Sequence, residues 1–290
     1  NKVNFTVQDT KLFNGQATVQ NGQFSIQFIL PKDIRFGAGN GLISAYASAT
    51  NNTDAGSAYS INISNTSFFN NNDTRGPDIQ LFLNDSLFKP GGLTHENPIL
   101  IAKLSDSSGI NATGNSIGHD IVLTIDGDIR NSIVVNNFYT ADIDSYQKGS
   151  IRFQLPTLTT GWHSIKLKAW DILNNSNEST LSFLVSPQEK LEIRELRNFP
   201  NPFNSGTTFS FEHNQPNTNL EVEIQIVNAS GQLVKKIART LTSNGTRLAS
   251  LYWQGDTDYG RKLGHGMYFY RIIVQAAGQQ KQLAQRLLLQ

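Results

Sequence analysis

The chain has no cysteine among its 290 residues. This absence excludes disulfide bonds, a thiolate nucleophile and any zinc site built on cysteine ligands. It leaves the redox compartment open. A chain without a thiol cannot carry out cysteine-based catalysis by itself, because that chemistry needs a thiolate as the attacking group.

Long apolar runs and an excess of charge are also missing. No stretch approaches 18 apolar residues, and the chain does not open with a charged, apolar and small-residue leader, so we expect neither a membrane-spanning helix nor a signal peptide. We expect the chain to be the C-terminal part of something longer. The net charge is only +1, which gives no whole-chain case for nucleic acid or a membrane surface. Residues 188–290 carry 12 basic and 8 acidic side chains, an excess better explained by ordinary surface variation than by an acidic partner.

No segment shows a useful helical period, whereas strand signals are frequent. Residues 24–30 place Phe24, Ile26, Phe28 and Leu30 on one face, which predicts a half-buried strand after a hairpin turn at 21–22. Further short strands are expected at residues 42–47 and 59–63, separated by a loop at 51–57. This is fewer strands than a sandwich needs, so we expect a first domain that is truncated or leans on a neighbour.

A polar segment at residues 69–77 has the composition of a linker, and a second group of strands follows it. Trp162 and Trp170 are interpreted as core or strand-edge aromatics. Seven short strands with turn residues between them predict an immunoglobulin-like sandwich. Their expected ranges are 79–83, 99–104, 121–125, 133–135, 150–155, 161–170 and 179–185.

A second short linker, residues 186–195, leads to the sequence NFPNPF at 198–203. Its two prolines are expected to hold the chain extended at the entrance to a third domain. Six strands are expected there, at 207–211, 221–227, 232–237, 248–253, 266–274 and 282–289. The sequence thus predicts an all-β chain of tandem immunoglobulin-like β-sandwich domains with bounds 1–75, 76–187 and 188–290.

Residues that could carry chemistry are few. The histidines are scattered, none at a spacing that brings two ligands together, and no catalytic residue is predicted; they are His95, His119, His163, His213 and His265. Oxygen-rich loops are the better signal, because Ca²⁺ takes six to eight oxygen ligands. Weak calcium candidates are Asp106 with Asp171, and Asp256 with Asp258; Asx turns explain each loop more simply. No other cofactor is predicted.

The last strand is apolar for a chain terminus. Leu283, Leu287 and Leu289 are candidate partner-binding residues, through edge pairing or insertion into a partner. The alternative is that this strand belongs to the core. A charge at residue 287 or 289 would weaken binding in the first case and unfold the module in the second.

Five motifs from residue 201 onward resemble the C-terminal secretion domain of the type IX secretion system, an all-β targeting module of Bacteroidetes cargo proteins. Their order and spacing over about ninety residues make the resemblance specific. The motifs are NPFN at 201–204, TTFSF at 207–211, VNASGQLV at 227–234, WQGD at 253–256 and GMYFYR at 266–271.

The rest of the chain is similar to the region that follows the peptidase domain in the PorU sortases, a family of gingipain-like cysteine peptidases. Segments carrying this similarity include FNG at 13–15, SDSSGINATGNSIGHD at 105–120 and LKAWD at 167–171. The resemblance implies an enzyme that cleaves C-terminal signals from type IX cargo and promotes attachment of the cargo to surface lipopolysaccharide. It also implies docking of the C-terminal domain to an outer-membrane barrel partner of the PorV type, at the cell surface after export through the periplasm.

The peptidase domain itself would precede Asn1, so no catalytic residue is carried over and this chain is expected to be inactive alone. An alternative is the C-terminal part of a type IX cargo protein, such as an adhesin or a hydrolase. Similarity between residues 79 and 171 favours the sortase, because cargo proteins vary freely there. A carbohydrate-binding sandwich would need a row of exposed aromatic residues, and the three tryptophans are too dispersed for it.

Overall fold

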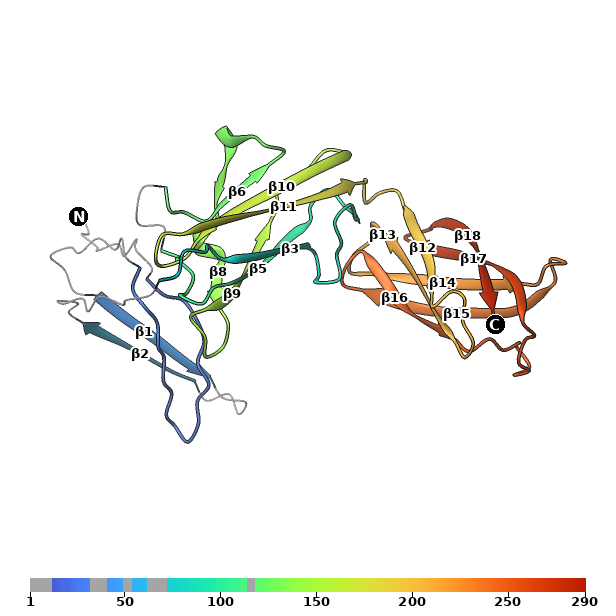
Figure 1. The fold of residues 1–290 in the computed structure, drawn as a ribbon, viewed down its shortest axis with the longest axis horizontal. Coiled ribbons are helices and arrows are strands. Elements are labelled where there is room, and N and C mark those ends of the chain that lie inside the picture. The colour runs from blue at the N-terminus through green and yellow to red at the C-terminus, as the bar shows by residue number, and fades with distance from the viewer. Residues whose placement is uncertain (1–11, 32–40, 49–53, 62–71, 114–117) are drawn as a thin grey trace.

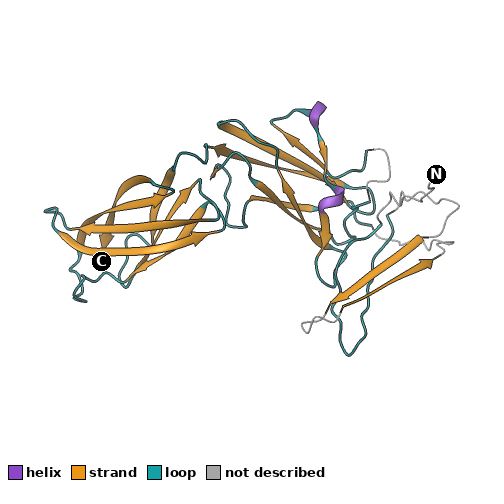
Figure 2. Ribbon diagram, turned by 180° about the vertical axis from the view of Figure 1, so that it is seen from behind, coloured by secondary structure: helices purple, strands orange, loops and turns teal. Residues whose placement is uncertain are grey.

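The computed structural model describes residues 12–31, 41–48, 54–61, 72–113 and 118–290. It is elongated and built from strands, with two short 3-10 helices, η1 (Ile129–Asn131) and η2 (Asn136–Phe138), seen in Figures 1 and 2. The described core falls into two clusters, one between residues 81 and 185 and one between 191 and 289. None of the helices in these ranges is long and apolar enough to cross a membrane.

Strands β1 (Gly41–Ser48) and β2 (Asp54–Ile61) form an antiparallel pair beside the first cluster (Figure 1). The predicted strand at 24–30 is wrong: these residues form no strand, and Phe24 and Ile26 are 55% and 44% exposed. The turn before it is present, as a single bridge between Gln20 and Gln23. Alternation alone does not make a strand, because a strand also needs a pairing partner and a core to cover its apolar face.

The middle module, defined as β3 to β11, consists of two sheets. One has the order β3-β5-β9-β8 and the other β4-β11-β10-β6-β7, and their inner faces share one core. The strands are β3 (Asp78–Leu83), β4 (Leu93–Thr94), β5 (Ile99–Ser105), β6 (Val122–Ile125), β7 (Ile133–Val134), β8 (Tyr139–Ala141), β9 (Lys148–Gln154), β10 (Gly161–Trp170) and β11 (Ser176–Val185). The short strands β4 and β8 were not expected from the sequence.

The C-terminal module, defined as β12 to β18, packs the sheet β12-β13-β16 on the sheet β15-β14-β17-β18. Phe209 and Tyr270, one from each sheet, meet at the centre with ring centroids 4.8 Å apart. The strands are β12 (Ile193–Phe199), β13 (Thr207–His213), β14 (Thr218–Val227), β15 (Leu233–Ser243), β16 (Arg247–Trp253), β17 (Gly266–Ala276) and β18 (Gln279–Leu289).

Strand β12 corrects the interpretation of residues 186–195 as a linker, because the strand begins at Ile193 and pairs with β13. The buried residues of β12 do not follow the two-residue alternation that predicts a strand from sequence. Ile193 and Leu196 are both buried although they are three residues apart, since a bulge between Arg194 and Arg197 shifts the register. Such a bulge breaks the alternation by which strands are recognised.

Residues 186–192 are also held in place, by hydrogen bonds to their backbone. The side chain of Asn214 donates hydrogen bonds to the carbonyl oxygens of Pro187 (2.8 Å) and Lys190 (2.7 Å), and Gln215 donates to that of Gln188. The division of the chain into domains at 75 and 187 stays a prediction. The segment at the second boundary is nevertheless held by two side chains of the turn that follows β13.

The two modules meet at a buried carboxylate, Glu212, which is 5% exposed. It accepts hydrogen bonds from Arg194 Nε (3.1 Å), Arg247 Nη1 (3.2 Å) and the backbone N–H of Leu93 (3.4 Å). Leu93 belongs to the middle module, and Arg194 also donates to the carbonyl oxygen of Gly91 there. A buried charge with this many donors holds its neighbours strongly, because removing one partner leaves the charge uncompensated.

Candidate docking surface and cation site

The last strand, β18, turns its apolar side chains in two directions. Leu287 is fully buried and Leu289 is 5% exposed, both inside the core of the C-terminal module, and Leu283 packs partly buried against that core. The burial of these side chains favours the core alternative for the predicted partner-binding residues. Leu288 lies on the opposite face of the strand, because successive side chains alternate.

Leu288 ends a row of apolar side chains on the outer face of the sheet β15-β14-β17-β18. The strand register places Leu233 opposite Val227, Val227 opposite Phe269, and Met267 opposite Leu288. We call these five residues the outer-face stripe. Leu233, Met267 and Phe269 are 50%, 49% and 43% exposed. A contiguous exposed apolar row of this kind is typical of an interaction surface.

The edge of β18 is covered near its end by the segment that carries the NPF sequence. The side chain of Asn201 accepts a hydrogen bond from the N–H of Leu288 (3.0 Å) and donates one to the carbonyl oxygen of Arg286 (3.2 Å). Phe203 continues the pairing, donating to the carbonyl oxygen of Leu288 (3.1 Å) and accepting from the N–H of Gln290 (2.9 Å). Asn201 therefore satisfies the edge as a neighbouring strand would.

Three carboxylates gather at one end of the middle module. Asp106 and Asp171 were expected together from the sequence, and Asp73 joins them, with oxygen atoms of all three within 4.8 Å of one another. Burial, with the charges of the other two carboxylates, raises the pKa of Asp106 to about 6, and burial also raises that of Asp171. Three oxygen donors at this distance can hold a calcium ion, which would offset their mutual repulsion.

Asp73 was missed because it lies in a polar segment that reads as a linker. The structure turns this segment back onto the module: Asp73 accepts hydrogen bonds from the hydroxyl groups of Ser107 (2.7 Å) and Ser108 (2.8 Å). A hydrogen bond from the N–H of Arg75, together with these two, lowers the pKa of Asp73 and so favours its ionised form. No sequence signal pairs residue 73 with residue 106.

The other predicted calcium candidates lie apart from this cluster. Asp256 pairs with Lys235 Nζ at 2.9 Å, and Asp258 accepts a hydrogen bond from the N–H of Lys236 at 3.2 Å. Both carboxylates hold the loop after β16 against β15. Each of these two carboxylates thus has a protein partner, and calcium binding there stays a prediction.

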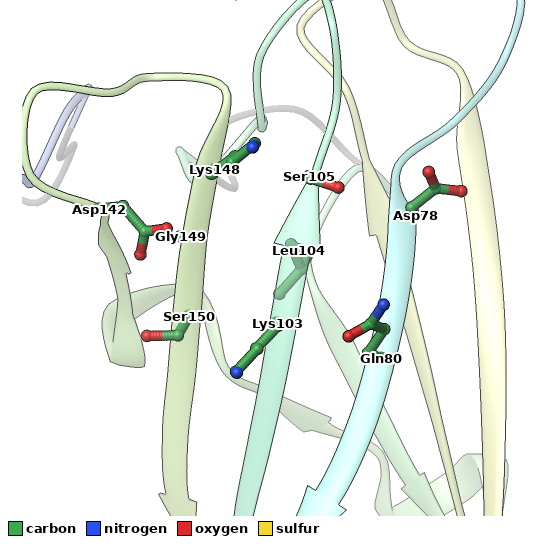
Figure 3. A pocket seen from close by; sticks show the side chains of 9 residues that line it. All are labelled: Asp78, Gln80, Lys103, Leu104, Ser105, Asp142, Lys148, Gly149 and Ser150. Atoms are coloured by element: carbon green, nitrogen blue, oxygen red, sulfur yellow. The ribbon is translucent and has the colours of Figure 1, made fainter. Parts of the chain in front are cut away.

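A shallow pocket of about 410 Å³ lies on the outer face of the sheet β3-β5-β9-β8 (Figure 3). Two cations, Lys103 and Lys148, and two carboxylates, Asp78 and Asp142, line it among small polar groups (Figure 3).

His163 forms a close histidine–carboxylate pair, with Nδ1 2.7 Å from Asp126. Its second ring nitrogen, Nε2, is 2.7 Å from the carbonyl oxygen of Thr159. Both ring nitrogens therefore have structural partners.

Comparison with known proteins gives two results, one for the C-terminal module and one for nearly the whole chain. Residues 197–286 match the family described as secretion system C-terminal sorting domain. The chain is also similar to dimeric latent PorU from Porphyromonas gingivalis, with 32% identity over 93% of this chain and a TM-score of 0.40. It spans 26% of the length of that protein.

More distant structures include tandem Ig and fibronectin domains. They include the tandem Ig repeats of Dlar, with 10% identity, 74% of this chain, 98% of that chain and a TM-score of 0.23. Three fibronectin domains of chicken CNTN1 show 8% identity, 83% of this chain, 73% of that chain and a TM-score of 0.24. These likenesses are too distant to carry an argument. None of the curated proteins matches the chain.

Proposed function

We propose that this chain is the non-catalytic part of a type IX sortase. The premise is that residues 197–286 belong to the family of secretion system C-terminal sorting domains and that the chain as a whole is a relative of the PorU C-terminal region. One observation carries the proposal: 32% identity to PorU extends over 93% of the chain and so includes the modules before the sorting domain. A sorting domain implies contact with the secretion machinery and export toward the cell surface.

The chain is not itself a cysteine peptidase, because it has no cysteine. We propose that the peptidase of the longer protein removes C-terminal signals from cargo, while β1 to β11 act as a spacer. The alternative is a type IX cargo protein. Sequencing the gene upstream of the codon for Asn1 decides between them: a Cys/His peptidase domain supports the sortase, and an unrelated domain there would make the chain part of a cargo protein.

We further propose that the C-terminal module docks to an outer-membrane barrel protein of the PorV type. The outer-face stripe supports this, because it joins apolar side chains from all four strands of one sheet, and those of Leu233, Met267 and Phe269 are exposed. The surface lies beside the residues first suspected in β18, but on the other face of that strand.

A pull-down of this chain with the purified barrel protein tests the docking. We expect Phe269→Glu and Leu288→Glu to reduce capture by tenfold or more while the circular dichroism spectrum stays unchanged. Tyr252→Glu is the matched control, because Tyr252 is 57% exposed on β16, which belongs to the other sheet of the module. Leu287→Glu should instead unfold the module, since Leu287 is fully buried. Equal capture of all folded variants would rule out the stripe, and no capture of the unmodified chain would rule out the partner.

A further inference from the structure

A second cleft lies where the two modules meet, and it is lined by both. Its volume is about 850 Å³, within the range of ligand sites, and sites of this kind are frequent between domains. Its floor is the outer face of β5 and β9, where Ile101 lies opposite Arg152 and Ile99 opposite Gln154. One wall comes from the C-terminal module, at the start of β14 and the end of β15.

The polar lining of the cleft both donates and accepts hydrogen bonds, because each of its asparagine and glutamine side chains carries an NH2 group and a carbonyl oxygen. Arg152 is exposed and has no ion pair in the part of the chain that the structure describes. His95 accepts a hydrogen bond at Nδ1 from the N–H of Asn97, so its Nε2 carries the proton and is a donor. Amide groups of Asn217 and Asn244 add further donors from the other module.

The two charged side chains of the lining, Arg152 and Asp85, indicate which charge a ligand should carry. Asp85 is the carboxylate among the lining residues, and one of its oxygens is already occupied by the N–H of Leu87 (2.8 Å). A guanidinium group without a partner binds a carboxylate strongly, through two parallel hydrogen bonds. The ligand should therefore carry carboxylates or other oxygen acceptors.

The floor distinguishes a peptide from a sugar. Ile99 and Ile101 are half-buried aliphatic side chains. Among the described residues that line the cleft there is no phenylalanine, tyrosine or tryptophan, so the imidazole of His95 is the one aromatic ring on which a sugar could stack. Side chains on one face of an extended peptide recur about every 7 Å, the same spacing as these two residues of one strand. An extended peptide can thus place apolar side chains on the floor and its main-chain carbonyl groups against the amide donors.

The cleft is also held in shape without a ligand. Glu212 and Arg194 fix the C-terminal module to residues 91–93, and the N–H of Gln188 donates to Glu96 (3.3 Å) across the same boundary. Pre-formed walls reduce the entropy that binding must overcome.

We propose that this cleft binds an extended acidic polypeptide segment, with a glutamate or aspartate on Arg152 and apolar side chains on Ile99 and Ile101. The site is separate from the outer-face stripe, which lies at the other end of β14, nine residues from Thr218 to Val227. That separation is about 30 Å along the strand, so docking of the C-terminal module and peptide binding are tested independently.

Fluorescence anisotropy with a capped, fluorescein-labelled peptide Gly-Glu-Val-Gly-Val-Glu-Gly tests the proposal on the whole chain. We expect saturable binding, and at least tenfold weaker binding of the peptide in which glutamine replaces both glutamates. Arg152→Gln should weaken binding of the acidic peptide by tenfold or more, the loss expected for a charge-assisted hydrogen bond. Asn217→Gly, which keeps the positive φ of 58° at that position, should weaken it through the second wall.

Lys166→Gln is the matched control, because it removes the same charge from β10 in the other sheet, where Lys166 pairs with Glu178 at 3.4 Å. Binding should be unchanged in this variant. The proposal is overturned if the acidic peptide does not bind at millimolar concentration, or if Arg152→Gln binds it as well as the unmodified chain. It is also overturned if a heparin hexasaccharide binds more tightly than the peptide and depends on Arg152, which would make the ligand a polyanionic sugar.

Discussion

His213 is a fully buried histidine at the end of β13. Its Nδ1 accepts a hydrogen bond from the N–H of Gln215 (3.2 Å), and burial lowers its pKa to about 4. The unfolded chain binds a proton here below about pH 6.5, whereas the folded chain does not until the pH falls to about 4. Stability contributed by the neutral ring is therefore present above pH 6.5 and is lost as the pH falls through this window.

We expect this single group to remove roughly 3 kcal/mol of unfolding free energy between pH 7 and pH 4. Urea unfolding at a series of pH values measures it. His213→Asn keeps an acceptor for Gln215 without titrating, so its stability should fall less over the same range, although it starts lower. His265→Asn, at an exposed position, should follow the unmodified chain. Identical acid limbs for all three proteins would contradict the assignment.

The carboxylates of Asp73, Asp106 and Asp171 lead to a prediction on metal binding. We propose that they bind calcium, and we expect Ca²⁺ at about 100 times its dissociation constant to add about 2.7 kcal/mol of stability. Thermal unfolding with calcium and with a chelator measures the shift, and metal analysis gives the stoichiometry. Asp171→Asn should abolish the shift, while Asp258→Asn, which lies in the other module, should keep it. A shift that survives Asp171→Asn would place the ion elsewhere.

At the scale of elements, most strands followed from period-two alternation bounded by turn residues, because a strand with one buried face shows its pattern locally. Strand β12 did not, since its bulge puts two buried residues three apart. Residues 24–30 show the opposite failure, an alternating segment without a strand. The face of β18 that is exposed also needed the structure, since alternation gives two faces and does not say which one a partner contacts.

Asn201 and the edge of β18 give a prediction at this scale. Asn201→Ala removes one accepted and one donated hydrogen bond to the backbone of β18, so we expect a loss of about 1 to 2 kcal/mol. Hydrogen exchange should show faster exchange of the Leu288 amide, whereas amides in the first half of the strand stay protected. Asn204→Ala, at the exposed neighbouring position, is the control. Equal protection of Leu288 in both variants would show that Asn201 does not hold the edge.

At the scale of the whole molecule, the all-β class and the positions of most strands along the chain were predictable, whereas the contacts between modules were not. Glu212 reaches Leu93 over 119 residues, and Arg194 reaches Gly91 over 103 residues. Nothing in the local sequence pairs such residues. The same reason explains why Asp73 was missed and why the cleft between the modules was not expected. Distant pairs become visible only when the sheets are assembled.

The buried carboxylate between the modules has a mechanical consequence. If two modules are joined only by a flexible linker, each can rotate freely, and binding of one module does not orient the other. Glu212 accepts hydrogen bonds from both modules and so fixes the orientation of one module relative to the other. Whatever grips the C-terminal module then also aims the middle module and anything attached to it.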